Sequence, residues 1–208
     1  MEEKKQKVGQ IRKKEILEAA KKVFLRKGFA DTVMEDILTE TSLSRGGVYY
    51  HYKSKVEILH DLMREGMAYR MDKMNEFMAK YSNELGKEAL AEMLVDRMLD
   101  ENELMSIYVI YLQAIKNNDE LKKLYPVLKE ETLHSDYGGD IKGVKLGDFR
   151  WNTTDFVLYF MNAIILGCEI LEARDNFWQN RDFLIKVMML YFDYYDEGKI
   201  KQKSDHSR

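Results

Sequence analysis

Apolar residues recur at helical spacing along nearly the whole chain, which contains a single Pro. In the first segment, Ile16, Val23 and Phe24 fall on one face of a helix that we expect over residues 10–27, with Gly28 as the residue that ends it. The residues before this helix are rich in Lys and Glu, and we expect them to form a mobile arm. The pattern predicts an all-α fold.

Two short helices should follow, because Ser and Thr residues stand where N-caps are needed. Thr32 lies three residues before Glu35, the spacing at which the two cap a helix start reciprocally, and this helix would cover about 33–40. Ser44 is the expected N-cap of a second helix over 45–50, since the preceding Thr-Ser-Leu-Ser run breaks the first. Two brief helices joined by a tight turn are the outline of a helix-turn-helix, whose second helix enters the major groove of DNA.

Longer helices account for the rest of the chain. Ser54 and Glu57 repeat the S-x-x-E start signal, and the helix that they open should run to about residue 81 with a Met-rich seam. Pro126 places a kink or a break in a later helix, and segment 135–150, with four glycines, is expected to be a flexible loop before a cap at 152–155. Beyond residue 86 the expected helices span about 87–101, 103–116, 120–134, 156–174 and 180–197.

Charge is distributed unevenly along the chain. Residues 1–60 hold 13 Lys and Arg against 9 Asp and Glu, net +4, whereas residues 61–208 are net −7, so that the whole chain carries −3. A basic end on an acidic body suits a protein that offers one end to phosphates. A difference of this size also arises by chance in helical proteins.

Segment 44–55, Ser-Arg-Gly-Gly-Val-Tyr-Tyr-His-Tyr-Lys-Ser-Lys, resembles the recognition segment of the tetracycline repressor (TetR-like) family. The stretch before it is similar as well, with Ile-Leu-Glu-Ala-Ala at 16–20, Gly-Phe at 28–29 and Ile37 at the family's spacing. The resemblance covers about residues 11–65, and beyond them only the helical pattern and the length are similar.

This resemblance implies an N-terminal three-helix helix-turn-helix DNA-binding domain and a C-terminal helical domain for ligand binding and dimerisation. We place the first at 1–60, the second at 61–200 and a polar tail at 201–208. The implied partners are double-stranded DNA with a palindromic operator, a small-molecule effector and a second copy of the chain.

Within the recognition segment, Arg45 and Tyr50 are the candidates for contacts with base edges, since Arg can bind guanine through two hydrogen bonds and Tyr50 occupies the family's variable position. The resemblance implies that Tyr49, His51 and Lys55 hold phosphates, and a helix-stabilising hydrogen bond is the alternative for His51. Lys55 also lies in the first turn of a helix, whose free N–H groups attract anions. The full set of expected DNA contacts is Thr32, Ser44, Arg45, Gly46, Gly47, Tyr49, Tyr50, His51 and Lys55.

Three positions depart from the residues usual in the family. Ser42 stands in place of a turn glycine, Leu38 where alanine is frequent and Gly47 where threonine is common. Ser42 must therefore tolerate the backbone of the turn, and each Gly of the Gly46-Gly47 pair weakens the recognition helix by roughly 1 kcal/mol relative to Ala. The threonine hydroxyl is lost as a DNA contact, whereas glycine lets the backbone approach the duplex closely.

The last two expected helices are apolar on more than one face, which indicates burial on several sides. Packing of this pair against the same pair of a second subunit would give a four-helix interface with two-fold symmetry, and burial within one subunit is the alternative. A dimer would also place two recognition helices about 34 Å apart, one turn of DNA. The expected interface residues are Phe156, Phe160, Ala163, Gly167, Ile170, Leu184, Met188, Tyr191 and Tyr195.

Aromatic and Met residues in the body suit the lining of a small-molecule pocket, although plain core packing explains most of them. An apolar or aromatic effector bound there would move the helix that begins at Ser54 and change the separation of the recognition helices. Repression is what the resemblance implies, and a constitutive DNA-binding dimer is the alternative. The candidate lining residues are Met98, Met105, Tyr108, Tyr111, Tyr125, Trp151, Tyr159 and Met161.

Other classes of function have little support. The sequence has no H-E-x-x-H, Walker or G-x-G-x-x-G motif, its histidines are scattered and Cys168 lies in an apolar run, so we expect no enzyme, metal or cofactor, with a spatially assembled active site as the alternative. The longest apolar run, 156–168, is shorter than the roughly 20 residues of a membrane-spanning helix. Since the first residues lack the apolar core of a secretory signal, we expect a cytoplasmic protein.

Overall fold

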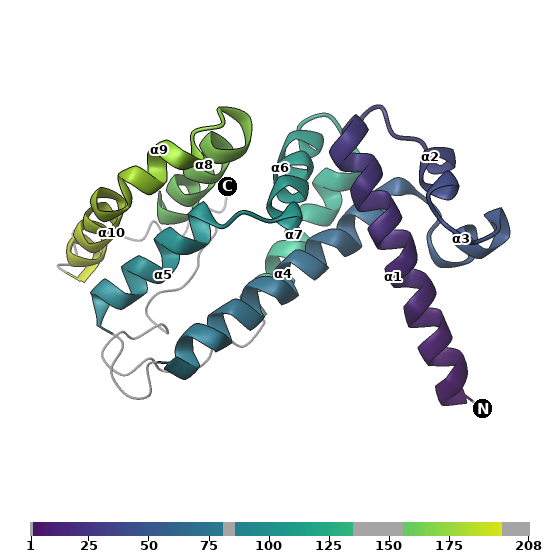
Figure 1. Ribbon diagram of the computed structural model, residues 1–208, viewed down its shortest axis with the longest axis horizontal. Helices are drawn as coiled ribbons and strands as arrows, with labels where there is room; N and C mark the ends of the chain where they lie inside the picture. Colours follow the sequence, from purple (N-terminus) through teal and green to yellow (C-terminus); the bar gives the residue numbers. More distant parts are fainter. Residues whose placement is uncertain (1, 81–85, 135–155, 197–208) are drawn as a thin grey trace, which may run out of the picture. The chain divides into compact units, whose positions relative to one another are not determined.

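The computed structural model describes residues 2–80, 86–134 and 156–196, and the regular structure in these ranges is entirely helical, which confirms the all-α prediction (Figure 1). No helix there combines the length and the apolar composition that a membrane span needs. Loop 135–150, Trp151, the cap at 152–155 and the tail at 201–208 lie outside the described residues. The helices are α1 (Glu2–Lys27), α2 (Met34–Thr39), α3 (Arg45–His51), α4 (Lys55–Lys80), α5 (Lys87–Leu99), α6 (Glu103–Ile115), α7 (Asp119–His134), α8 (Phe156–Ile170), α9 (Arg174–Gln179) and α10 (Arg181–Asp196).

These helices belong to two compact units. Unit 1 comprises Met1–Asn75 and Glu101–Ser135, and unit 2 comprises Glu76–Asp100 and Asp136–Arg208. One boundary falls inside α4, and two others enclose α6 and α7. Unit 1 therefore contains α6 and α7 in addition to the helix-turn-helix.

The core of unit 1 joins helices that are distant in sequence. Val48 and Tyr52 are buried, as expected of core anchors, and Phe29 packs in the same cluster. Burying one large aliphatic or aromatic side chain contributes about 1.5–3 kcal/mol, so this cluster is what holds the short helices in place. Fully buried members from α1, α2, α3, α4 and α6 include Ile16, Val23, Phe24, Ile37, Val48, Leu59, Leu62 and Ile107.

The loop after α1 begins as the sequence predicts and then differs from it. Gly28 has φ +74° and its N–H donates to the Phe24 carbonyl at 2.8 Å, which confirms its role in ending α1. The expected reciprocal cap between Thr32 and Glu35 is wrong. Val33 is the N-cap of α2, and its N–H donates to the Asp36 carboxylate at 2.8 Å. The hydroxyl of Thr32 instead donates to the Gly28 carbonyl at 2.6 Å, so it secures the loop.

Two other expectations about helix ends are also wrong. The residues expected as a mobile arm form the first turns of α1, which begins at Glu2, because Glu, Lys and Gln are good helix formers and extend a helix that is packed farther along. The break considered at Pro126 does not occur, since α7 continues through it.

Unit 2 packs α5 against α8, α9 and α10. Its buried side chains include Leu94 and Met98 from α5, Met161 from α8, and Leu184 and Met188 from α10. The helix expected to end at about residue 174 ends at Ile170, and the connection expected before residue 180 contains a further short helix, α9.

Gly167 allows the turn between α8 and α9 to form. Its carbonyl accepts hydrogen bonds from the N–H groups of Leu171 and Ala173, and Glu172 between them has φ 53°. A Cβ at Gly167 would lie only 2.9 Å from a ring carbon of Phe177, so glycine is needed for α9 to pack on α8. The guanidinium of Arg174 then donates to the Leu99 carbonyl at 2.8 Å, which satisfies the C-terminal end of α5.

Candidate nucleic-acid interface

Helices α2 and α3 of unit 1 form the helix-turn-helix. Ser44 is the N-cap of α3, as expected, and its Oγ accepts a hydrogen bond from the Gly47 N–H at 3.2 Å. Val48 on the inner side of α3 is fully buried, whereas Tyr50 has 79% of its surface exposed. Arg45 and Gly46 are exposed as well. α3 is therefore anchored by one side and presents the other, with its candidate base-reading residues, to solvent.

The turn between α2 and α3 does not require the glycine that Ser42 replaces. Among the described residues, Glu172 alone of the non-glycines has a positive φ, so Ser42 adopts an ordinary backbone conformation. Its N–H donates to the Glu15 carboxylate of α1 at 2.6 Å. Hydrogen bonds from Ser42 lower the pKa of the Glu15 carboxyl, which keeps the acceptor charged. The turn is thus attached to α1 through a charge-assisted hydrogen bond.

Gly46 and Gly47 leave the first turn of α3 without side chains. A Cβ at Gly46 would meet nothing within 4 Å, and one at Gly47 would lie 3.4 Å from Ser44 Oγ, at the edge of ordinary contact. The packing of unit 1 therefore does not demand glycine at Gly46. The consequence of the pair is an exposed backbone at the start of the helix, where another backbone or a phosphate can approach closely.

The guanidinium of Arg45 is held at the surface of the protein by two groups. Arg45 Nη2 donates to Glu35 Oε1 of α2 at 2.8 Å, and Arg45 Cζ lies 5.6 Å from the centroid of the Tyr49 ring. The side chains of Arg45 and Glu35 remain 70% and 55% exposed. Arg45 thus has a defined position while most of its N–H donors face solvent.

The environment of His51 is cationic. Partial burial is the largest cause of its lowered pKa, and the charges of Lys13 and Arg12 on α1 lower the pKa further. The imidazole is therefore neutral near pH 7, and a phosphate placed beside it would raise its pKa. The ring of Tyr50 meets His51 edge to face, with 5.1 Å between ring centroids. Basic residues of α1 thus border the end of α3.

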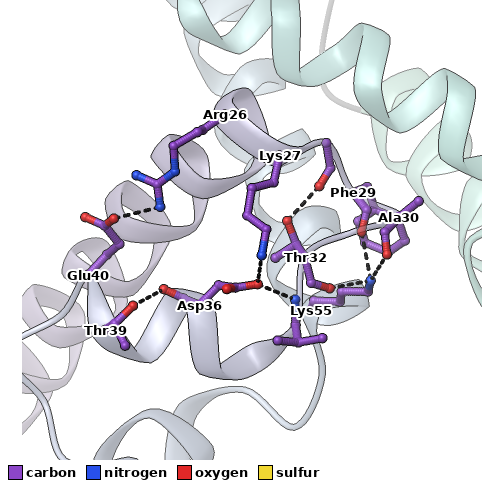
Figure 2. Close-up of polar contacts among 11 residues, drawn as sticks. Arg26, Lys27, Phe29, Ala30, Thr32, Asp36, Thr39, Glu40 and Lys55 are labelled. Carbon is purple, nitrogen blue, oxygen red and sulfur yellow. Dashed lines mark hydrogen bonds and ion pairs between the residues drawn. The ribbon is translucent and has the colours of Figure 1, made fainter.

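Lys55 has a role other than the expected phosphate contact. Its Nζ donates to the carbonyls of Phe29, Ala30 and Thr32 at 2.7, 3.1 and 2.6 Å, as Figure 2 shows. An ammonium group has three N–H donors, so all of them are used within the protein. Nζ also lies 4.6 Å from the centroid of the Phe29 ring. Lys55 therefore holds the loop between α1 and α2, and the expectation of a direct phosphate contact is corrected.

Thr32 needs the same correction. Its side chain is fully buried, and its hydroxyl donates to the Gly28 carbonyl rather than facing the surface. A phosphate contact through this hydroxyl is excluded in this conformation. Sequence spacing does not reveal the roles of Thr32 and Lys55, because their partners are carbonyls of the loop and not side chains that a motif displays.

Salt bridges at the surface also join α1 to α2. Lys27 Nζ lies 2.7 Å from the Asp36 carboxylate, and Arg26 Nη2 lies 2.9 Å from that of Glu40 (Figure 2). The hydrogen bond from Lys27 is the main reason why the pKa of Asp36 is lowered. Exposed pairs of this kind contribute about 0–1 kcal/mol each, so they adjust the position of α2 more than they stabilise it.

The residues expected at a subunit interface fall into two groups in unit 2. Phe156, Ala163 and Ile170 are exposed on α8, and Phe160 and Tyr191 are partly buried. Leu184, Met188 and Gly167 are covered by their own chain and have no surface to offer a partner, which corrects these three assignments. Nothing is described for the side chain of Tyr195. The exposed apolar stripe of α10 is instead formed by Phe183, Leu190 and Tyr194.

The candidate pocket residues are divided between the two units. Tyr108, Tyr111, Tyr125 and Met105 belong to unit 1, whereas Met98, Met161 and Tyr159 belong to unit 2. Tyr159 is 62% exposed on the outer face of α8, so it does not line an enclosed site within its unit. Trp151 lies outside the described residues. In unit 1, the rings of Tyr111 and Tyr125 are neighbours, with 6.5 Å between centroids.

The anchored and exposed α3, the preceding α2 and the basic border define unit 1 as a helix-turn-helix module of the kind that binds double-stranded DNA. Residues 16–62 match the bacterial regulatory proteins of the tetR family. The chain is 32% identical over 144 residues to YfiR, an HTH-type transcriptional regulator of Bacillus subtilis (strain 168), a match that covers 67% of this chain and 68% of YfiR. The chain therefore belongs to the tetR family and is a DNA-binding transcriptional regulator.

Two other comparisons agree with this assignment. YerO, another HTH-type transcriptional regulator of Bacillus subtilis (strain 168), is 25% identical over 174 residues, which cover 79% of this chain and 60% of YerO. The solved structure of Salmonella enterica GusR has the same fold, with a TM-score of 0.57 at 14% sequence identity. The match covers 86% of this chain and 92% of the GusR chain. The two relatives from Bacillus are transcriptional regulators, which agrees with the expectation that the chain is not an enzyme.

Replacing Lys55 with Met should lower the free energy of unfolding by about 2–3 kcal/mol, because three carbonyls lose a charged donor and the bonds to two of them are partly buried. Urea unfolding followed by circular dichroism measures the change. Lys14, an exposed residue of α1, provides the control, and Lys14→Met should alter stability by less than about 0.5 kcal/mol. Equal stabilities of the two variants would contradict the structural role of Lys55.

Proposed function

We propose that this protein is a cytoplasmic repressor that binds a palindromic operator as a homodimer. A small apolar or aromatic effector either releases the protein from the operator or promotes its binding. The observation that carries the proposal is the exposure of two side chains of α3, Arg45 in its first turn and Tyr50 on the face opposite Val48, which anchors the helix in the core. An exposed, rigidly mounted helix in a family of DNA-binding regulators suits insertion into the major groove.

Arg45 and Tyr50 are the proposed readers of base edges. A guanidinium donates two parallel hydrogen bonds to guanine, and such a pair discriminates against other bases by about 1–3 kcal/mol. Proposed contacts with phosphates come from Tyr49, His51 and the backbone around Gly46, and these contacts set the register without reading sequence. Ser44 supports them indirectly because it caps the helix.

Selection from random duplex DNA at physiological salt should enrich a palindrome, because a two-fold dimer presents two copies of α3. Arg45→Ala should lower the ratio of operator to non-specific affinity roughly 5- to 100-fold, in line with the loss of one bidentate base contact. Arg26→Ala is the matched control, since Arg26 is an exposed Arg of unit 1 that also pairs with a Glu, Glu40 at the C-cap of α2. Selection of no sequence by the wild type, or an unchanged ratio in Arg45→Ala, would contradict the proposal.

The proposed dimer interface lies on the exposed apolar stripes of α8 and α10. Phe156 and Ile170 on α8 are 67% and 50% exposed, and Phe183 and Leu190 on α10 are 65% and 67% exposed. Positions 183, 187, 190 and 194 follow helical spacing, so the α10 residues share one face. Contiguous apolar surface of this kind marks an interaction site, and two copies of α8 and α10 would bury it in a four-helix arrangement.

Leu190→Glu should convert the dimer to a monomer at micromolar concentration, because a carboxylate would be buried without a partner in the interface. Sedimentation equilibrium measures the mass. Lys123→Glu places the same charge on an exposed position of α7, in unit 1, and should leave the dimer intact. A wild type that sediments as a monomer, or a Leu190→Glu variant that stays dimeric, would count against this interface.

The proposed effector site is the tyrosine group of α6 and α7 in unit 1. Tyr111 is fully buried, and its hydroxyl has no hydrogen-bond partner among the described residues. Burial raises its pKa to about 12, so it stays a neutral donor. Leaving a buried hydroxyl unpaired costs about 1–3 kcal/mol, which a ligand with an acceptor atom would recover.

Tyr111 also lies in the core that positions α3. It belongs to the same buried cluster as Val48, Tyr52 and Leu59. A ligand that displaces Tyr111 would therefore disturb the packing that anchors the recognition helix. This continuity supports an effector-responsive switch over a constitutive DNA-binding dimer, provided that the effector prefers one conformation.

A thermal-shift screen of small aromatic compounds should find ligands that raise the melting temperature and change the affinity for the selected operator. Tyr111→Phe should raise the free energy of unfolding by about 1 kcal/mol, since an unpaired buried hydroxyl is removed. The same variant should lose most of the ligand-induced shift in melting temperature. Tyr159→Phe, a change at an exposed ring, should retain it. A stabilising ligand that leaves operator affinity unchanged would favour the constitutive alternative.

A further inference from the structure

We propose that Glu35 is a specificity-determining residue that acts through Arg45. It holds the guanidinium ready for a base edge and neutralises its attraction to phosphates in general. The inference rests on the proposed function, in which Arg45 reads a base, but it concerns a residue of α2 and not of the recognition helix.

The geometry around Arg45 suits such a positioning role. The Glu35 carboxylate accepts one hydrogen bond, from Nη2 at 2.8 Å, and the Tyr49 ring lies beside the guanidinium with 5.6 Å from Cζ to the centroid. A guanidinium has five N–H donors, so one carboxylate contact leaves enough of them for a bidentate contact with guanine. Glu35 itself lies in the first turn of α2, where the helix dipole favours a negative charge.

The pair contributes little to the fold, which separates its proposed role from a structural one. Both side chains are more than half exposed, and exposed ion pairs of this kind have little effect on stability. An Arg side chain that is free in solution loses rotamer freedom when it binds, whereas one that is already held does not. Restraint of Arg45 therefore favours the duplex that offers the matching base edge.

Charge acts in the same direction. An unpaired Arg near DNA strengthens binding to every sequence, because it attracts phosphates. The Glu35 carboxylate cancels this attraction for Arg45, so that binding to sequences without the matching base becomes weaker. Orientation raises operator affinity and neutralisation lowers non-specific affinity, and both increase the ratio between them.

Glu40, the C-cap residue of α2, provides a control. Its carboxylate also accepts a hydrogen bond from an Arg, at 2.9 Å from Arg26 Nη2, and that pair is exposed as well. Arg26 belongs to α1 and lies outside the recognition helix. Removal of Glu40 therefore removes one negative charge from unit 1, as removal of Glu35 does, without releasing Arg45.

The test measures the affinity of each variant for the selected operator and for a duplex altered at the base pair that Arg45 reads. Glu35→Ala should lower the ratio of the two affinities roughly 3- to 10-fold, the size of a side-chain ordering cost. Glu35→Gln, which keeps an acceptor but loses the charge, should lower it less. Glu40→Ala should leave the ratio unchanged. In an Arg45→Ala background, Glu35→Ala should have no further effect on the ratio.

Each contrary outcome has a distinct meaning. If wild type shows no preference among sequences, the proposed function fails. If wild type selects an operator but Glu35→Ala keeps the same ratio, or Glu40→Ala lowers it as much, the role of Glu35 is overturned. A drop in the ratio that persists without Arg45 would show that Glu35 does not act through it. Urea unfolding of Glu35→Ala should show no more than the small loss expected when a charge is removed from a helix N-terminus, and a larger loss of stability would replace the proposal with a structural role.

Discussion

A helix of seven residues with two glycines is not stable in water, and the recognition helix α3 is such a helix. Its conformation therefore depends on the burial of Val48, and of Tyr52 at its end, in the core that α1, α2, α4 and α6 also form. This constraint decides which side of α3 is exposed. Since Val48 occupies the inner face, Tyr50 lies on the opposite one, and Arg45 is exposed in the first turn. The DNA-binding surface is thus a consequence of core packing.

Polar contacts then fix the short connections between the helices that the core holds in place. Lys55 binds three carbonyls of the loop between α1 and α2, Thr32 binds a fourth, and Glu15 accepts a hydrogen bond from the turn before α3. Backbone groups of these short connections have no helix or sheet partners, so side chains have to satisfy them. Residues that a motif comparison associates with DNA thus include some whose contacts are internal, and these residues determine the position of α3 without touching the duplex.

Unit 2 illustrates what a one-dimensional pattern leaves open. α10 is apolar around much of its circumference, so spacing alone could not tell which stripe packs on α5 and which faces outward. Leu184 and Met188 turned out to be core, while Leu190 is exposed. Likewise, Gly167 was expected at the subunit interface, but the group that approaches it closely is Phe177 of the same unit. Helical periodicity defines faces, and only the neighbours of a helix decide what each face does.

The sequence alone determined the features whose causes are local. Most helix positions, the end of α1 at Gly28 and the cap at Ser44 depend on residues within a few positions of one another. Contacts between distant residues were decided by the tertiary structure, because no local rule links their positions. They include the pairing of Glu35 with Arg45, the binding of loop carbonyls by Lys55 and the choice of faces on α10.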